Sequence, residues 1–332
     1  MHGSHWDHME LIDNFLTKMS NLLPSLNCIK SYLLINAPLV VIGSIFNLSL
    51  YLTVQPLSSM SPIIAIIMEV LIFGIKNFTL LFGIDLLTKS RPDINDRVKV
   101  DSNEELLSSQ SSWKSVISSV ATFTILETGT YDIARASGLI HLSAHISHKR
   151  ISEIIIWAIC FFGSFIITSF VVEIIFDFFH YWTHRFLHYQ PVLYRSFHSL
   201  HHHNSNPTVY HTFNDSVCGT IVTNTIPHIF ALLVFSIFFR RPITHSEHSL
   251  LLVYKTFVEV SGHSGKELGK ASSFPQCKWL PTFFGIELYT FDHHSHHRNS
   301  KTNFSKRFVL WDKIFQTYSL QPKSDKKRRQ LK

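Results

Sequence analysis

Charged residues are scarce in this chain of 332 residues. Asp, Glu, Lys and Arg make up 16% of the sequence, whereas about 25% is usual in soluble globular proteins. Phenylalanine, in contrast, occurs 28 times, and 45% of all residues are hydrophobic. So much apolar surface exceeds what a soluble fold usually buries. We therefore predict an integral membrane protein, with a large soluble protein built from buried helices as the alternative.

Cysteine is also scarce. The four cysteines are Cys28, Cys160, Cys218 and Cys277, and they show no paired spacing. This excludes a disulfide-stapled scaffold and a cysteine-based zinc site. The N-terminal stretch "MHGSHWDHMELIDNF" lacks the basic segment that precedes the apolar core of a cleaved signal peptide. We therefore expect the first apolar run to direct membrane insertion.

Four long apolar runs supply candidate membrane helices. A helix rises about 1.5 Å per residue and needs roughly 20 apolar residues to cross the hydrocarbon layer. One run contains Glu69, Lys76 and Asp85, which are costly in a bilayer unless each faces a partner. The stretch 115–150 is ambiguous between an interfacial helix and a poor span, which leaves the number of spans open. The runs are residues 32–54, 62–87, 154–172 and 217–239.

These patterns predict an all-α integral membrane bundle in three parts. Residues 1–150 form an N-terminal membrane hairpin and a polar connector, residues 151–320 hold most of the histidines, and residues 321–332 form a basic tail. The stretch "KSDKKRRQLK" has six basic residues and one acidic residue, a net charge of +5 out of +7 for the chain. Beside a membrane domain, such a tail favours contact with anionic lipid over nucleic acid.

Histidines are grouped in three short patterns, here called histidine boxes. Within each box, histidines stand three or four residues apart, which places side chains on one face of a helix. We therefore expect each box to direct two or three imidazoles to one point. Imidazole is a ligand for iron, zinc and copper, whereas magnesium and calcium prefer oxygen. The boxes are His184-x-x-x-His188, His198-x-x-His201-His202 and His293-x-x-His296-His297.

The number of histidines favours two metal ions over one. The boxes supply eight imidazoles, and His263 in "GHSG" is a ninth candidate, whereas one ion with an open position takes about three or four. His180, one helical turn before His184, is a candidate for a further ligand or for an outer residue. His211 and His228 are weaker candidates.

Three carboxylates stand near the boxes, namely Asp177, Glu259 and Asp292. A metal-bound imidazole usually donates its second N–H to a carboxylate or to a carbonyl, which fixes the tautomer. These acids are therefore candidates for that acceptor, and a role as helix caps or interfacial acids is an equal alternative.

The boxes, in this order and beside apolar runs, resemble the fatty acid hydroxylase superfamily, in particular its sterol desaturase and methylsterol oxidase branch. The resemblance covers residues 154–318 and includes the stretches "YWTHRFLH", "LYRSFHSLHH", "GHSG" and "WDKIFQTY". It implies that residues 151–320 form a hydroxylase-like catalytic domain, an all-α histidine-rich di-metal domain on the cytoplasmic side. Hydroxylation and desaturation differ in how the substrate is placed, so the spacing of the boxes does not separate them.

The resemblance also implies a reaction. The expected protein is a di-iron, O2-dependent oxygenase acting on a sterol or fatty acyl chain in the endoplasmic reticulum membrane. Electrons would arrive from NAD(P)H through cytochrome b5 or a reductase, and zinc would be an alternative metal after isolation. The rival readings are a membrane metal- or lipid-binding protein without turnover and a zinc-dependent hydrolase. The implied metal ligands are His184, His188, His198, His201, His202, His263, His293, His296 and His297.

Overall fold

The computed structural model describes residues 26–54, 61–92, 113–142, 151–204, 207–266, 268 and 271–319. In these residues the regular structure is helical, apart from two strands of two residues each, β1 (Ile140–His141) and β2 (Ile243–Thr244), which pair in parallel. Four helices are long and apolar enough to cross a membrane. The predicted all-α membrane architecture is therefore confirmed, whereas the basic tail lies outside the described residues.

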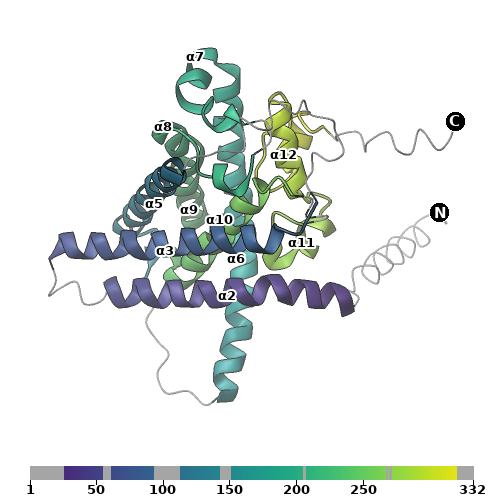
Figure 1. Ribbon diagram of the computed structural model, residues 1–332. Coiled ribbons are helices and arrows are strands. Elements are labelled where there is room, and N and C mark those ends of the chain that lie inside the picture. The colour runs from purple at the N-terminus through teal and green to yellow at the C-terminus, as the bar shows by residue number, and fades with distance from the viewer. Residues whose placement is uncertain are drawn as a thin grey trace, which may run out of the picture.

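The first two apolar runs form two long helices, α2 (Leu26–Val54) and α3 (Pro62–Thr88), which lie side by side (Figure 1). Proline at the first position of α3 suits a helix start, because that residue needs no backbone N–H partner. The ambiguous stretch after the connector is helical as α5 (Trp113–Ala136), a helix of 24 residues that is not among the four candidate membrane spans.

The charged residues of α3 are tolerated because each has a polar partner. Lys76 Nζ lies 2.7 Å from a carboxylate oxygen of Glu127 on α5. Glu69 is 3.6 Å from the guanidinium of Arg135, also on α5. Asp85 accepts a hydrogen bond of 2.9 Å from the hydroxyl of a tyrosine, Tyr210. The charges therefore join helices to each other instead of facing lipid.

The third apolar run is part of α6 (Ile151–Tyr189), a helix of 39 residues. At about 1.5 Å per residue it is about 58 Å long, roughly twice the thickness of the hydrocarbon layer. It crosses α2 and α3 steeply, and its N-terminal part extends beyond the other helices (Figure 1). That part exposes apolar side chains such as Ile155, Ile156 and Ile159. The opposite end of α6 carries the first histidine box.

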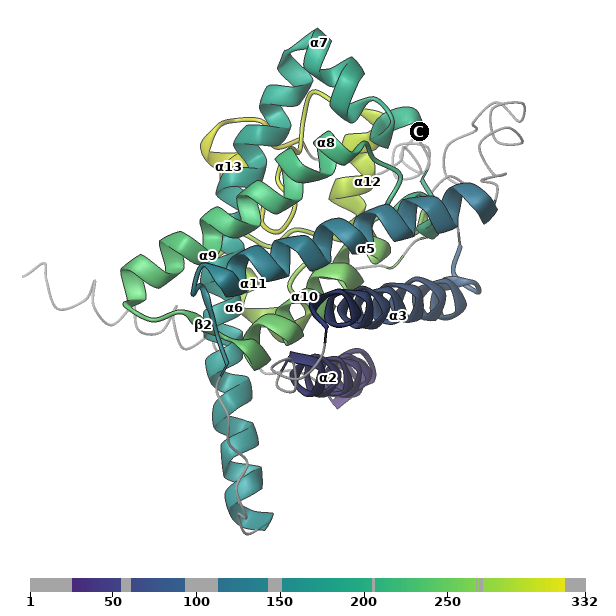
Figure 2. The ribbon, with the colours of Figure 1, turned by 90° about the vertical axis from the view of Figure 1, so that its left-hand side faces the viewer.

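The fourth apolar run is interrupted near its start. It consists of α8 (Val217–Thr220), the π-helical turn η6 (Ile221–Thr225) and α9 (Ile226–Phe239). The chain then turns at Arg240, whose φ of 52° is left-handed, and passes through β2 into α10 (His245–Gly262). Figure 2 shows α10 between the α2–α3 pair and α6.

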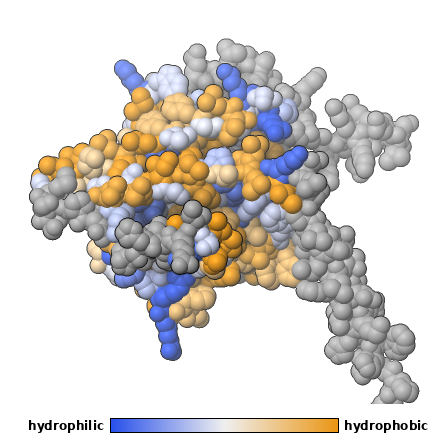
Figure 3. Space-filling view, turned by 90° about the horizontal axis from the view of Figure 1, so that it is seen from below, coloured by the Kyte–Doolittle hydropathy of each residue, from blue (hydrophilic) through white to orange (hydrophobic). Residues whose placement is uncertain are grey.

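Helix α10, which leads back to the histidines, is almost completely buried. One apolar core includes side chains from α2, α3, α6, α9 and α10. The N-terminal hairpin and the histidine-rich part therefore share a core, and their division at residue 150 stays a prediction. Hydrophobic side chains also dominate much of the face seen in Figure 3.

Short helical segments build the region around the boxes. Several are single turns, so their positions depend on tertiary contacts more than on helix propensity. They are α7 (Pro191–Leu193), η3 (Tyr194–His198), η4 (His201–His203), η5 (Val209–His211), η7 (Pro275–Cys277), α11 (Trp279–Phe283), α12 (Thr290–Arg298) and α13 (Leu310–Ile314).

Candidate metal centre

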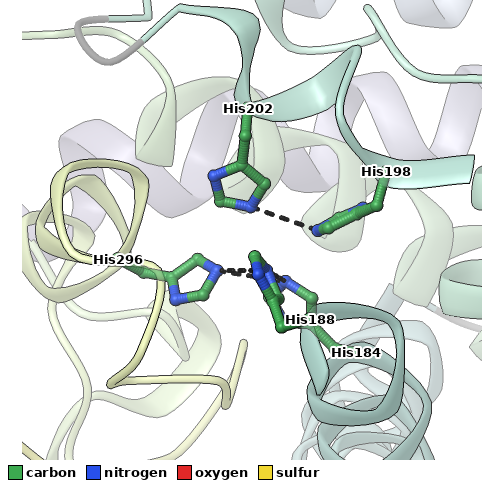
Figure 4. Close-up of side chains that lie close together, drawn as sticks. All are labelled: His184, His188, His198, His202 and His296. Carbon is green, nitrogen blue, oxygen red and sulfur yellow. Dashed lines mark hydrogen bonds between the residues drawn. The ribbon is translucent and has the colours of Figure 1, made fainter. Parts of the chain in front are cut away.

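The nine histidines singled out in the sequence lie in two adjacent groups. In each group, one nitrogen from every histidine lies within 4.8 Å of the others. The groups meet where α6 and α12 approach the turns η3 and η4. The first group comprises His184, His188, His198, His202 and His296 (Figure 4), and the second comprises His201, His263, His293 and His297.

In the first group, Nε2 atoms face one another at short distances. His296 Nε2 lies 3.1 Å from that of His184 and 3.2 Å from that of His188. His198 and His202 are 3.1 Å apart between their Nε2 atoms. The ring centroids of His188 and His202 are 4.6 Å apart, which brings the two pairs together. Figure 4 shows the five rings converging from three segments of the chain.

The second group has the same short distances with fewer rings. His263 follows the last residue of α10, and its Nε2 lies 3.2 Å from the Nε2 atoms of both His293 and His297 on α12. His201 completes the group, with its ring centroid 4.7 Å from that of His297. The sequence distance between His201 and His297 shows that tertiary packing, not local spacing, builds this group.

Each box directs two imidazoles to one group, as expected, but two of the three boxes also direct a third imidazole to the other group. In the second box, His198 and His202 belong to the first group, whereas His201 belongs to the second. The third box divides in the same way, with His296 apart from the other two histidines. Residues four apart are separated by about 40° around a helix and stay together, whereas adjacent residues are separated by about 100° and diverge.

Backbone carbonyls fix the orientation of several rings. His184 Nδ1 lies 2.9 Å from the carbonyl of Phe304, and His296 Nδ1 lies 2.7 Å from that of Thr302. In the second group, His263 Nδ1 is 2.8 Å from the carbonyl of Glu259. A carbonyl only accepts hydrogen bonds, so each Nδ1 carries the proton and each neutral ring presents an Nε2 lone pair to its group.

Burial keeps the histidines outside the apolar spans neutral. It lowers the pKa of His198, His201 and His297 well below the usual range, and neighbouring histidines lower it further. It also lowers the pKa of His296 to about 4. Neutral imidazole is the form that binds a metal ion.

These geometries fit a metal ion in each group. His184 and His296 present lone pairs to each other at 3.1 Å and, with both protons on Nδ1, form no hydrogen bond between these atoms. Two nitrogens bound to one ion at about 2.1 Å are about 3.0 Å apart at a right angle and about 3.4 Å apart at a tetrahedral angle. The observed separations fall in this range. That the nine histidines bind metal stays a prediction.

The remaining histidines have other contacts. His180 is held by a 2.7 Å hydrogen bond between its Nδ1 and the carbonyl of Thr223, and it belongs to neither group. His211 Nδ1 bonds to the hydroxyl of Thr208 at 2.9 Å. His228 pairs with a histidine on α10. These three are therefore outer residues and not members of the groups.

The three acids near the boxes do not orient histidines through their carboxylates. Asp177 accepts hydrogen bonds from the consecutive backbone N–H groups of residues 306–308. Asp292 accepts from the backbone N–H of Tyr289 at 2.9 Å in a capping box. Glu259 orients His263 through its backbone carbonyl instead. The alternative role of a helix cap is thus observed for Asp292, whereas Asp177 binds backbone N–H groups and the carboxylate of Glu259 pairs with Lys306.

Two adjoining cavities lead away from the histidines. The first is lined by His184, His198, His201 and His293, and also by Asp215, for which burial raises the pKa to about 7. The second lies between α5, α9 and α10. Neither Asp215 nor the second cavity could be predicted from the sequence, because their surroundings come from segments far apart in the chain. The two cavities share Phe123, Thr220, Asn224 and Glu259.

Comparison with known proteins identifies the family of this region. Residues 169–317 match the sequence model of the fatty acid hydroxylase family. Residues 169–317 of this chain are therefore a domain of the fatty acid hydroxylase superfamily. The superfamily predicted from the histidine boxes is therefore confirmed, and the matched region contains all nine histidines.

Several characterised proteins are similar to this chain. A fatty acid hydroxylase of Lecanicillium sp is 31% identical over 150 residues, which cover 43% of this chain and 40% of that protein. The sphingolipid C4-hydroxylase of Saccharomyces cerevisiae is 31% identical over 152 residues, covering 42% and 37%. A very-long-chain aldehyde decarbonylase of Oryza sativa subsp. japonica is 32% identical over 150 residues, covering 42% and 21%.

The matches are confined to part of each relative. This chain spans 40% or less of the length of these three proteins. No solved structure gives a significant match. The similarity is therefore informative about the histidine-rich region.

Proposed function

We propose that this chain is a membrane-bound di-iron oxygenase that uses O2 to oxidise a lipid. The observation that carries the proposal is the arrangement of two adjacent groups of neutral histidines, with Nε2 lone pairs directed inward, beside apolar helices. A protein that only stores or carries a metal does not need a cavity beside its ligands. Here the first cavity is lined by histidines of both groups.

The two groups would hold one iron ion each, the first with five imidazoles and the second with four. When bound, the irons would supply O2 activation and the cleavage of an unactivated C–H bond, which no amino-acid side chain provides. Zinc remains the alternative metal in isolated protein, because it also binds imidazole. A site with eight or nine histidines exceeds the three protein ligands usual for a zinc hydrolase.

The residues of the chain position the rings and exclude water. The carbonyls of Thr302, Phe304 and Glu259 hold protons at Nδ1 and so direct Nε2 atoms into the groups. Phe304 also packs its ring against His188 and His296, at centroid distances of 5.6 and 5.5 Å. A dry surround of this kind protects a reactive oxidant from side reactions.

The names of the relatives support an acyl-chain lipid as the substrate. They act, by name, on fatty acids, sphingolipids or very-long-chain aldehydes. This favours an acyl chain over the sterol that the sequence slightly preferred. The reaction is hydroxylation, oxidation or desaturation, since these share an initial C–H abstraction and differ in the placement of the substrate.

The proposed setting is the endoplasmic reticulum membrane, with the histidines on its cytoplasmic face. Electrons would come from NAD(P)H through cytochrome b5 or a reductase. The projection of α6 beyond the thickness of a bilayer supports the placement of the histidines at a membrane surface. Cysteine introduced at the exposed Asn299, beside the third box, should react with an impermeant thiol reagent from outside sealed microsomes without detergent.

Metal analysis of the protein purified in detergent tests the proposal. We expect about two irons per chain, and membranes containing the protein should form a lipid product that carries oxygen from labelled O2 if the reaction is hydroxylation. One zinc per chain without iron would contradict the proposal. Two irons without O2 consumption in the presence of NAD(P)H and a donor would favour a metal-binding protein without turnover.

A further inference from the structure

The second cavity contains a lysine that the proposed oxidation chemistry does not use. Lys255 lies on α10 and lines this cavity together with Glu127, His228 and His248. The cavity adjoins the one beside the histidine groups and shares Glu259 with it. A molecule occupying both cavities would therefore reach from Lys255 to the histidines.

Positive charge exceeds negative charge around Lys255. Arg307 Nε lies 2.8 Å from a carboxylate oxygen of Glu173. Lys306 Nζ lies 2.6 Å from a carboxylate oxygen of Glu259, which Arg307 also approaches at 3.7 Å. Three cations and two carboxylates leave one positive charge over, and each of the two acids already has a close partner.

Lys255 is the cation without an acidic partner in this cluster. Among the described residues, no carboxylate makes an ion pair with it. Its Nζ instead lies 3.9 Å from the centroid of the Phe176 ring. Burial, and then the charge of Arg307, lowers the pKa of Lys255 to about 7. A cation in such surroundings is unfavourable unless an anion accompanies it.

Other polar groups of the second cavity are already matched in charge. Glu127 lies 2.7 Å from the ammonium of Lys76, and this pair is neutral as a whole. His228 and His248 hydrogen-bond to each other through Nε2 atoms 2.9 Å apart. Asp177, near residues 306–308, directs its carboxylate to backbone N–H groups. The surplus charge of the cavity is therefore located at Lys255.

We infer that the second cavity binds the anionic oxygen group of a lipid, a carboxylate, and that Lys255 is its partner. The ammonium donates hydrogen bonds to the carboxylate, and the ion pair offsets the surplus charge. With the head of the lipid held at Lys255, the carbons next to it point toward the adjoining cavity beside the histidines. Lys255 then determines which carbon reaches the metal groups. The inference rests on the proposed function only in taking the ligand to be a lipid.

Competition binding measures this recognition without turnover. The full chain in nanodiscs is incubated with radiolabelled palmitate, which is displaced by unlabelled palmitate, by hexadecanol or by hexadecyl phosphate. A charge-assisted hydrogen bond predicts that palmitate binds about 10-fold tighter than hexadecanol or more. Hexadecyl phosphate tests whether the site prefers a phosphate to a carboxylate. Tighter binding of hexadecyl phosphate than of palmitate would assign the site to a phosphate.

Three variants identify the group responsible. Lys255→Met should reduce the preference for palmitate over hexadecanol to about 1-fold, and Lys255→Arg should keep most of it. Lys255→Met removes the surplus charge and leaves no acid without its partner, so the fold should persist. Lys278→Met is the matched control, because Lys278 also lies over an aromatic ring, at 5.7 Å from Trp279, but does not line the second cavity.

Each outcome decides the inference separately from the proposed function. A preference for palmitate that survives in Lys255→Met, or no preference in the unmodified chain, would overturn the inference. His201→Ala should lose oxidation and keep the preference, because His201 belongs to a metal group and not to the second cavity. If the purified chain holds no iron and still requires Lys255 for the preference, the proposed oxygenase fails and the carboxylate site stands.

Discussion

The two histidine groups share the second and third boxes, the first group also contains the first box, and the two are built in different ways. The first group contains two pairs of histidines four residues apart, on α6 and across the turn from η3 to η4, and one further ring. The second contains one such pair, on α12, and two single histidines from other segments. A pair on one helical turn is held together by local backbone geometry, whereas a single histidine depends on tertiary packing. The second group should therefore be the more fragile.

The carbonyls that orient the rings also differ between the groups. In the first group they belong to Thr302 and Phe304, in an irregular segment after α12. In the second group the carbonyl belongs to Glu259, within the buried helix α10. The first group thus has more histidines, and the carbonyls that orient them lie in an irregular segment. The second group has fewer histidines, and the carbonyl that orients His263 lies in a regular helix.

The largest effect should follow from His201→Ala. It reduces the second group from four imidazoles to three and removes a ligand that no neighbour on its own segment replaces. We expect the metal content to fall from about two ions per chain to about one, and product formation to fall by about 100-fold or more. Membrane insertion should be unchanged, because His201 lies outside the apolar spans. His297→Ala should have the same effect.

His202→Ala is the matched comparison for this variant. The two residues are adjacent in η4, but His202 belongs to the first group, which would keep four imidazoles. Metal content should then fall less than in His201→Ala. Equal losses in the two variants would show that the groups do not differ in fragility, and substantial turnover in His201→Ala would remove that residue from the proposed ligands.

Acidification should destabilise both groups alike, because it protonates histidines in both. The difference in fragility between them should therefore disappear at acidic pH. Burial lowers the pKa of His202, His263 and His293, among others, in the folded chain. As the pH falls, these histidines therefore bind protons in the unfolded chain before they do so in the folded chain. Stability is then full above the unfolded pKa of about 6.5 and declines as the pH falls below it, by up to about 1.4 kcal/mol per histidine and pH unit. The decline should continue to pH 4, near which His296 titrates in the fold.

Thermal unfolding of the metal-free protein at pH 8, 6, 5 and 4 measures this slope. A melting temperature that is constant between pH 8 and pH 5 would contradict the neutral, buried state of the histidines. Repeating the series with metal bound should lower the stability at acidic pH still further relative to pH 8, because protonation of imidazole also releases the ion.

Much of this architecture was predictable because its signals are local. The apolar runs predicted the long helices, and the boxes together with His263 in "GHSG" predicted all nine histidines that converge. The combination of histidines from different boxes into two groups was not predictable, because it depends on tertiary packing between segments far apart in the chain. The role of backbone carbonyls in orienting rings was also hidden, since a carbonyl belongs to every residue and leaves no sequence pattern.

The support of the first group can be weakened without touching a ligand. Asp312 Oδ1 accepts the backbone N–H of Phe304 at 2.9 Å, and Oδ2 accepts that of Ser305 at 2.8 Å. Asp312→Asn places an NH2 donor against one of these N–H groups, at a cost of about 1–3 kcal/mol. We expect the first group to lose metal affinity by about 10-fold, because the carbonyl of Phe304 orients His184.

Chelator titration followed by metal analysis resolves this effect. In the unmodified chain the second group should release its metal first, giving two phases. In Asp312→Asn the phase of the first group should move to lower chelator concentration, while that of the second group stays in place. A shift of both phases together would mean that Asp312 stabilises the whole region and not one group.

The smallest effect should come from His203→Ala. His203 follows His202 directly and ends the run of histidines in the second box, yet its side chain is exposed and belongs to neither group. The 3-10 turn η4 places successive residues about 120° apart, so His201 and His202 face different groups and His203 turns outward. Metal content and product formation should therefore change by less than about 2-fold, because substitutions of exposed residues usually have small effects. A loss as large as that of His202→Ala would mean that η4 rearranges when metal binds. His203 would then be a further metal ligand from the second box.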